Sequence, residues 1–150
     1  MGFRWTLLVA LGLNSCFLLT GCCKKTVDTS TVLTNNSGET LSITSYFKSG
    51  SQGNISIENG SINKSGNNDV WIVLAENDLF YIDSLIVKYG NKKTTIHYGE
   101  GVQGNTVSAL EFGSPRNLLN EVNYRKNIIT DKKCSYIAEY HYAFIPEDAR

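Results

Sequence analysis

The chain has 150 residues, with 14 Lys and Arg against 14 Asp and Glu, so its formal net charge at pH 7 is zero. This length suits one domain rather than two, and the balanced charge argues against a nucleic-acid-binding protein. Glycine is frequent at 13 residues and proline is rare at 2. This composition, rich also in Ser, Thr and Asn, favours strands joined by turns over helices.

The first 21 residues have the layout of an export signal. Arg4 provides a positive start, and an apolar stretch from Trp5 to Leu19 follows it. The stretch is too short and too interrupted by polar residues to span a bilayer permanently. It ends in Leu19-Thr20-Gly21-Cys22, and Lys24-Lys25 follow shortly after. These lysines would add attraction to anionic lipids.

The tetrapeptide resembles the lipobox of bacterial lipoproteins, which has an aliphatic residue, a small or hydroxyl residue, glycine and cysteine. The resemblance implies that signal peptidase II cuts between Gly21 and Cys22, and that Cys22 carries diacylglycerol and so binds the lipid bilayer. Each buried methylene adds roughly 0.8 kcal/mol, so two or three acyl chains make release negligible. The alternatives are an ordinary cleaved signal peptide and an uncleaved short anchor. The absence of Asp after Cys22 resembles signals for the outer membrane, with the periplasmic or surface face left open.

We divide the chain into a signal peptide (1–21), a flexible lipidated tether (22–29) and a β-sandwich domain (30–150). Cys16 leaves with the signal and Cys22 is acylated, so Cys23 and Cys134 remain as thiols. A disulfide between them would fit an oxidising envelope. Because Cys23 lies on the tether and Cys134 opens a core strand, we expect two free thiols instead.

The first half of the domain shows the alternation of apolar and polar residues that is typical of strands. We predict a hairpin in which Thr31 to Leu33 and Leu41 to Phe47 flank the turn Asn35-Asn36-Ser37-Gly38. Short edge strands are expected around Ile55, Ile57 and Ile62. The continuous apolar run from Val70 to Ala75 predicts a strand that is buried on both faces.

The second half contains the clearest hairpin, from Asp83 to Tyr98 with a turn at Gly90-Asn91. Ser114-Pro115 predicts a helix of one or two turns through Leu118, Leu119 and Val122, because proline suits the first helical position. The last strand is predicted from Cys134 to Ile145, with one face formed by Tyr136, Ala138, Tyr140, Tyr142 and Phe144. We therefore expect an all-β fold, a two-layer antiparallel sandwich of six to eight strands that is Ig-like or transthyretin-like.

Three segments resemble a broad group of small envelope lipoproteins from Gram-negative bacteria. They are Asn35-Asn36-Ser37-Gly38 with the strand of Leu41 and Ile43, the strand opening Asp83-Ser84-Leu85, and Tyr142-Ala143-Phe144-Ile145-Pro146-Glu147-Asp148. The resemblance implies a sandwich in the cell envelope and no particular activity. Proteins of this group would continue a few residues beyond Arg150.

An acidic cluster is the first candidate site. Glu76, Asp78 and Asp83 surround an aromatic segment and could bind calcium or act as paired carboxylates in glycoside hydrolysis, although loop solubility explains them as well. Trp71, together with Tyr136, Tyr140 and Tyr142, could form a platform for stacking sugars. We favour core packing for these tyrosines.

Other motifs are weaker. Residues 99–104 match G-x-G-x-x-G, with Glu121 at a suitable distance for a ribose, but without a convincing following helix we interpret the motif as a loop between strands. The oxygen-bearing residues Asn63, Ser65, Asn67 and Asp69 resemble a calcium loop only faintly, because one carboxylate offsets the desolvation of the ion poorly. His97 and His141 lack metal-ligand spacing and are expected on a sheet face or rim. We expect no metal and no cofactor.

Our leading hypothesis is a non-enzymatic, lipid-anchored envelope protein that binds a protein, a glycan or another envelope component. The alternative is a small envelope hydrolase that acts on glycan through Glu76, Asp78 and Asp83. A third hypothesis is a structural subunit, which would show an exposed sheet edge or apolar patch.

Overall fold

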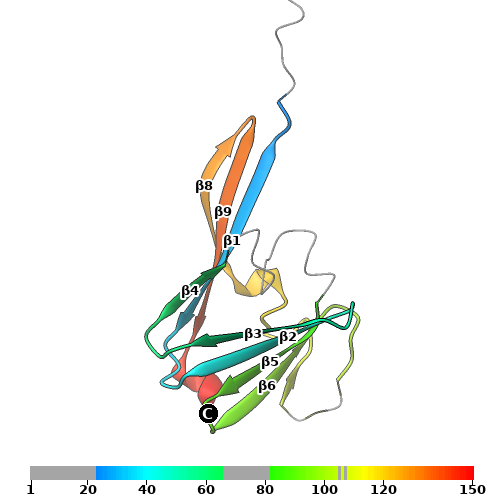
Figure 1. Ribbon diagram of the computed structural model, residues 1–150, viewed down its shortest axis with the longest axis vertical. Coiled ribbons are helices and arrows are strands. Elements are labelled where there is room, and N and C mark those ends of the chain that lie inside the picture. Colours follow the sequence, from blue (N-terminus) through cyan, green and yellow to red (C-terminus); the bar gives the residue numbers. More distant parts are fainter. Residues whose placement is uncertain (1–22, 66–81, 105, 107) are drawn as a thin grey trace, which may run out of the picture.

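The computed structural model describes residues 23–65, 82–104, 106 and 108–150. Within them the fold is an all-β sandwich of two sheets, as the sequence predicts (Figure 1). The first sheet has the strand order β4-β1-β9-β8, with the bounds β4 Ile62–Ser65, β1 Thr26–Asn35, β9 Ser135–Phe144 and β8 Arg125–Lys132. The second has the order β3-β2-β5-β6-β7, with the bounds β3 Gln52–Ile57, β2 Leu41–Phe47, β5 Ile82–Tyr89, β6 Lys93–Tyr98 and β7 Ala109–Leu110.

The second sheet is built around the predicted hairpin of β5 and β6. The two strands pair antiparallel from Ser84 opposite Tyr98 to Tyr89 opposite Lys93. Gly90 turns the chain with a φ of 50°, which glycine adopts more readily than other residues. Strand β3 forms one edge of this sheet and β4 one edge of the first, so both predicted edge strands are confirmed.

The predicted hairpin of β1 and β2 is wrong, because these strands belong to different sheets. The chain crosses between the layers at Asn35, which is fully buried. Its Nδ2 donates to the backbone oxygens of Glu39 and Ile57, both at 2.8 Å, and its Oδ1 accepts from Ser37. The turn residues therefore form a corner of the sandwich, where buried polar groups are paired as they must be.

Both sheets are mixed, whereas we expected only antiparallel pairs. Strands β1 and β9 run parallel along their full lengths, from Thr26 opposite Ser135 to Asn35 opposite Phe144. The pair of β6 and β7 is also parallel. Because β1 begins at Thr26, regular structure starts four residues before the predicted domain boundary at Ser30. The described residues form nine strands, one more than the predicted maximum.

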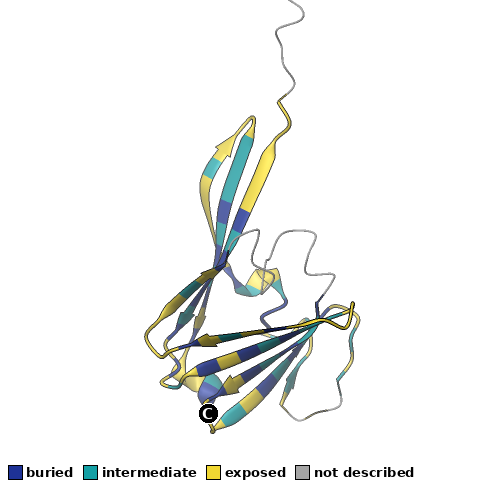
Figure 2. Cartoon of the chain, in the orientation of Figure 1, coloured by how far each residue is buried: buried dark blue, intermediate teal, exposed yellow. Residues whose placement is uncertain are grey.

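The alternation of β9 creates one wall of the core, as predicted. Its inward residues Ala138, Tyr140, Tyr142 and Phe144 are all buried (Figure 2). The rings of Tyr142 and Phe144 meet edge to face with centroids 5.0 Å apart, and Tyr124 lies 5.3 Å from Tyr142 on the other side. These rings pack against Leu41, Ile43, Leu85 and Val87 of the opposite sheet within one core cluster.

Between β7 and β8 the chain is irregular and lacks the helix that we predicted from Ser114. Turns lead to the short 3₁₀ helix η2, Glu121–Asn123, and a second one, η3, Pro146–Ala149, follows β9. Leu118 and Leu119 are nevertheless buried in the core. Side-chain hydrogen bonds from Asn117 and Asn120 to nearby backbone groups replace the regular helical ones. The predicted strand from Val70 to Ala75 lies outside the described residues.

One part of the first sheet extends beyond the second sheet (Figure 1). We call it the arm and define it as residues 23–32 and 125–141, which are β8 with its partners in β9 and β1. Strand β8 was not predicted, because seven of its eight residues are exposed and none is buried. A bulge between Ile128 and Thr130 interrupts its pairing with β9.

Candidate functional site

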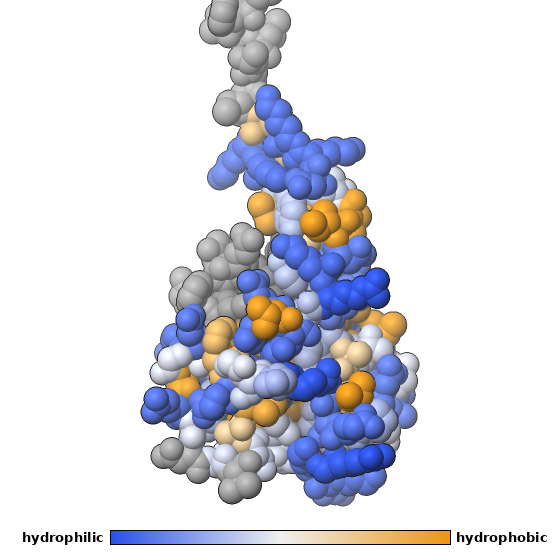
Figure 3. All heavy atoms as spheres, turned by 180° about the vertical axis from the view of Figure 1, so that it is seen from behind, coloured by the Kyte–Doolittle hydropathy of each residue, from blue (hydrophilic) through white to orange (hydrophobic). Residues whose placement is uncertain are grey.

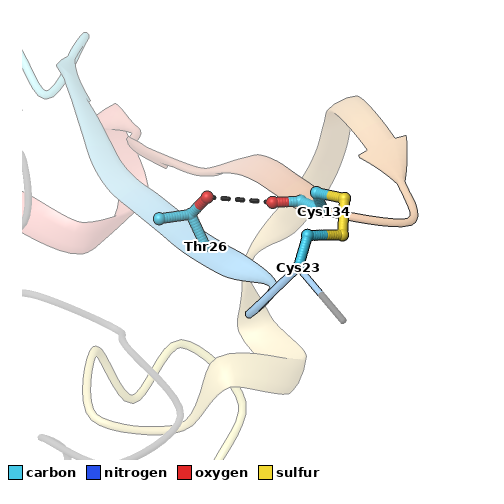
Figure 4. Close-up of a disulfide and its surroundings, with 3 residues drawn as sticks. All are labelled: Cys23, Thr26 and Cys134. Carbon is cyan, nitrogen blue, oxygen red and sulfur yellow. Dashed lines mark hydrogen bonds between the residues drawn. A yellow bond between two sulfur atoms is a disulfide. The ribbon is translucent and has the colours of Figure 1, made fainter. Parts of the chain in front are cut away.

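The end of the arm is closed by a disulfide between Cys23 and Cys134 (Figure 4). Their Cα atoms are 5.6 Å apart although 111 residues separate them in the sequence. Thr26 supports the bond, because its backbone nitrogen and its Oγ1 donate to the Cys134 oxygen at 3.0 and 2.9 Å. Our expectation of two free thiols is therefore wrong. The parallel pairing of β1 and β9 places Cys23 beside the turn that holds Cys134.

Lysines surround this disulfide and continue along the arm. Lys25 pairs with Asp131 at 2.9 Å, and its ammonium lies 5.1 Å from the centre of the Tyr136 ring. Lys126 lies over the rings of Tyr136 and Tyr140, at 5.5 and 5.2 Å from their centres. Such cation–π contacts hold the long lysine side chains over the rings of Tyr136 and Tyr140.

An open groove of about 280 Å³ lies on this face of the arm. It is lined by Lys25, Val27, Thr29, Tyr136 and Tyr140. The strand register explains the common face, because Val27 is opposite Tyr136 and Thr29 is opposite Ala138. Ile128 is opposite Ala138 from the other side and joins the same face. The groove is thus a continuation of the core-facing side of the sheet.

A second cavity, of about 300 Å³, lies where β6 and β7 meet the C-terminal residues. Arg116 and Asp148 line it together with Tyr142. The Arg116 Nε donates to Asp148 Oδ1 at 3.0 Å, and Nη2 donates to Asp148 Oδ2. The guanidinium lies 4.5 Å from the centre of the Tyr142 ring, whose hydroxyl donates to the Arg116 backbone oxygen at 2.9 Å. Burial lowers the pKa of Arg116, but the hydrogen bonds to Asp148 outweigh it and the net pKa is raised.

His97 is the most deeply buried polar residue in the lining of this cavity, with 1% of its surface exposed. Its Nδ1 lies 3.0 Å from the backbone nitrogen of Leu118 and accepts that hydrogen. The ring proton is therefore on Nε2, which has no hydrogen-bond partner among the described residues. Burial lowers the pKa of His97 to about 4, so the ring is neutral at pH 7. His97 thus lies on a face of its sheet, as expected, but on the buried face that packs in the interior.

The lining of this cavity carries balanced charges and a histidine whose Nδ1 is already occupied. Lys93 and Glu147 add one charge of each sign to its lining, so it has no strong preference for anions or cations. His97 uses Nδ1 to hold Leu118 and therefore cannot take a proton there from a neighbouring hydroxyl. The walls combine aromatic rings with hydrogen-bonding groups, which suits a small polar molecule.

Most residues of the predicted sites lie outside the described residues. These are Gly21, Cys22, Trp71, Glu76 and Asp78. Asp83 is described and lies half-buried on β5, where its backbone oxygen accepts from Gly99 at 2.9 Å. The structure thus places one member of the acidic cluster and leaves the carboxylate spacing untested.

The described residues of the weaker motifs lie in turns, in a 3₁₀ helix and in strands. Residues 99–104 form turns between β6 and β7, as the loop interpretation predicts, and Glu121 begins η2. Asn63 and Ser65 belong to β4 and are thus part of a strand, whereas Asn67 and Asp69 lie outside the described residues. No group of three potential metal ligands occurs within the described ranges. His141 is half-buried, and its Nε2 lies 3.1 Å from Glu139.

Tyr140 and Tyr142 are core residues, as we favoured, whereas Tyr136 is only half-buried. Sequence reasoning did not identify Arg116 and Asp148. The Asp148 carboxylate also accepts from the backbone nitrogen of Ile145 at 2.9 Å. The proline that begins η3 was the only local signal for the helix that carries Asp148.

The comparisons with known proteins return no matching protein family, no matching curated protein and no matching solved structure. The finer prediction of an Ig-like or transthyretin-like topology therefore gains no support from them. In the described part of the chain, no helix has the length and apolar character needed to cross a membrane.

Proposed function

We propose that the chain is a lipid-anchored lipoprotein of the bacterial cell envelope and that its sandwich is a non-enzymatic binding module. The observation that carries this proposal is the disulfide of Cys23, which directly follows the acceptor cysteine of the lipobox. Structural disulfides persist in oxidising compartments such as the periplasm and the cell surface. The bond therefore supports export independently of the signal sequence.

The same bond changes how an acylated Cys22 would hold the domain. A long flexible tether would let the domain move freely, but Cys23 is linked to Cys134 and Thr26 already pairs with Ser135. Consecutive Cα atoms are about 3.8 Å apart, so Cys22 follows the end of the arm without a spacer. The lipid would thus hold the domain at the bilayer by the arm, most simply in the outer membrane.

The cavity beside His97 supports a binding role for the rest of the domain. Its volume of about 300 Å³ suits a small molecule or one residue of a larger glycan or protein. It lies with η3, whereas the lipid would be attached beyond the opposite end of β9. A ligand in this cavity would therefore be bound away from the membrane surface.

Metabolic labelling with palmitate tests the anchor. We expect the unaltered protein to incorporate label and to sediment with membranes, and Cys22→Ser to lose both properties. Cys23→Ser is the matched control, because it removes the neighbouring thiol and the disulfide but keeps the acceptor, and we expect it to stay labelled. Label in Cys22→Ser, or unchanged membrane partition of that variant after a high-salt wash that removes electrostatic attachment, would contradict the proposal.

A further inference from the structure

We propose that the groove face of the arm binds the surface of an anionic phospholipid bilayer. This inference rests on the proposed lipid anchor, and it adds a second, electrostatic attachment beside the acyl chains. The face consists of Lys25 with its partner Asp131, Val27, Ile128, Tyr136 and the Lys126 side chain above Tyr140.

The first argument is the distribution of charge. The arm carries the six basic residues Lys24, Lys25, Arg125, Lys126, Lys132 and Lys133 and the three acidic residues Asp28, Asp131 and Glu139. The rest of the chain after Cys22 has seven basic residues and 11 acidic ones. Basic residues beside a lipid anchor are attracted to anionic headgroups, whereas the acidic remainder would be repelled. This asymmetry orients the arm toward the bilayer.

The second argument is exposed apolar surface. Val27, Ile128 and Ile129 are 56%, 54% and 53% exposed, and they are three of the six large apolar residues that are exposed in the described residues. Figure 3 shows apolar surface on the arm among hydrophilic atoms. Apolar and tyrosine side chains between lysines are the composition of interfacial membrane-binding surfaces.

The third argument is geometry, which favours an arm lying along the surface over one inserted end-on. Lys132 and Ile129 are three residues apart on β8, which is roughly 10 Å along a strand. End-on insertion that buried Ile129 would also carry the lysines next to the disulfide into the hydrocarbon. An arm that lies flat on its groove face places Val27 and Ile128 at the same depth as Lys25 and Lys126. The groove between Lys25 and Tyr140 then faces the headgroups.

Fluorescence quenching by brominated lipids tests this contact in the acylated protein. The protein is reconstituted into phosphatidylcholine vesicles with and without phosphatidylglycerol. Ile128→Trp reports on the arm. Ile62→Trp is the matched control, because Ile62 is 66% exposed on the same sheet but lies near its other end. The unaltered chain gives the background from Trp71.

We expect Ile128→Trp to be quenched at least about twofold more than Ile62→Trp in anionic vesicles, because the arm lies in the interface. High salt and the charge reversal Lys132→Glu with Lys133→Glu should reduce the difference, while Lys48→Glu with Lys88→Glu should leave it unchanged. Equal quenching at both positions, or the same quenching in neutral vesicles, would overturn the inference while the anchor stands. Failure of every variant to stay with the vesicles would overturn the anchor as well.

Discussion

Arg116 binds Asp148 through two of its nitrogens and thereby fixes the C-terminal turn to the chain between the sheets. Arg116 has a φ of 70°, which is uncommon for a residue with a side chain. This conformation is held by the Asp148 pair, by the Tyr142 ring and by the bond from Nη2 to the Ala143 oxygen. The residue joins β9, η3 and one wall of the cavity.

We expect Asp148→Asn to lower the free energy of unfolding by about 1–2 kcal/mol. The carboxylate pair is only partly buried, with Arg116 36% exposed, so solvent screening reduces the value of a charged hydrogen bond. Urea denaturation measures the change. The neighbouring variant Glu147→Gln is the control, because Glu147 is exposed and should shift stability by less than about 0.5 kcal/mol. Equal effects of the two variants would show that the pair is not stabilising.

His97 makes stability depend on pH. Its pKa is about 4 in the folded chain and 6.5 in the unfolded one, so the unfolded chain binds the proton more readily. The contribution of neutral His97 to the free energy of unfolding is therefore complete above pH 6.5. It is lost as the pH drops from 6.5 toward 4, which lowers the free energy of unfolding by up to about 3 kcal/mol. His97→Asn, which keeps an acceptor for the Leu118 N–H, should remove that part of the slope. Denaturation at several pH values would contradict this if both chains kept the same slope.

Asn117 is fully buried and organises the segment that carries Arg116 and Leu118. Its Nδ2 donates to the backbone oxygens of Tyr98, Leu110 and Glu111 at 2.8–3.0 Å. We expect Asn117→Ala to cost about 2–4 kcal/mol, because several buried oxygens lose their donor. Asn117→Asp keeps the shape but turns a carboxylate toward those oxygens, and it should be at least as damaging. Thermal unfolding that ranked the aspartate variant near the parent would refute this account.

The disulfide should stabilise the domain by about 2–4 kcal/mol, because it closes a long loop in the unfolded chain. Cys134→Ser should lower the free energy of unfolding by that amount in urea denaturation, and reduction of the parent protein should have the same effect. Alkylation without reductant should label neither Cys23 nor Cys134 in the folded protein. Rapid alkylation of both would show that the bond does not form.

Local patterns predicted the strands whose burial alternates along the chain. Strand β9 has small or aromatic residues at every second position, so its core face follows from the period of a strand. The hairpin of β5 and β6 combines such alternation with a Gly-Asn turn, and both signals are local. These elements depend on few distant contacts.

The structure differs from the sequence-based predictions where strands pair with distant parts of the chain. The Asn35 to Gly38 turn predicts a reversal of the chain, but nothing in its sequence says whether the next strand joins the same sheet. Strand β8 is an exposed strand at the edge of its sheet and lacks apolar alternation, so its sequence looks like a loop. The disulfide depends on the parallel register of β1 and β9, which connects residues more than a hundred positions apart.

The site was harder to predict than the fold for the same reason. His97, Arg116 and Asp148 come from three separate segments, and their contacts exist only after both sheets have formed. The sequence placed His97 in a strand correctly but could not show that the ring would be buried behind Leu118. Of the two lysines on the groove face, Lys25 was visible in the pair Lys24-Lys25, whereas Lys126 joins it only through the β8–β9 pairing.

The parallel pairing of the first strand with the last has a consequence for how the protein reaches its final structure. Thr26 bonds to Cys134 across 108 positions, so the first sheet cannot close until nearly the whole chain is available. Topologies dominated by such distant contacts fold slowly. The edge of β1 that pairs with β9 therefore stays open until the end of the chain is available, and the incomplete chain is most exposed to aggregation at that strand.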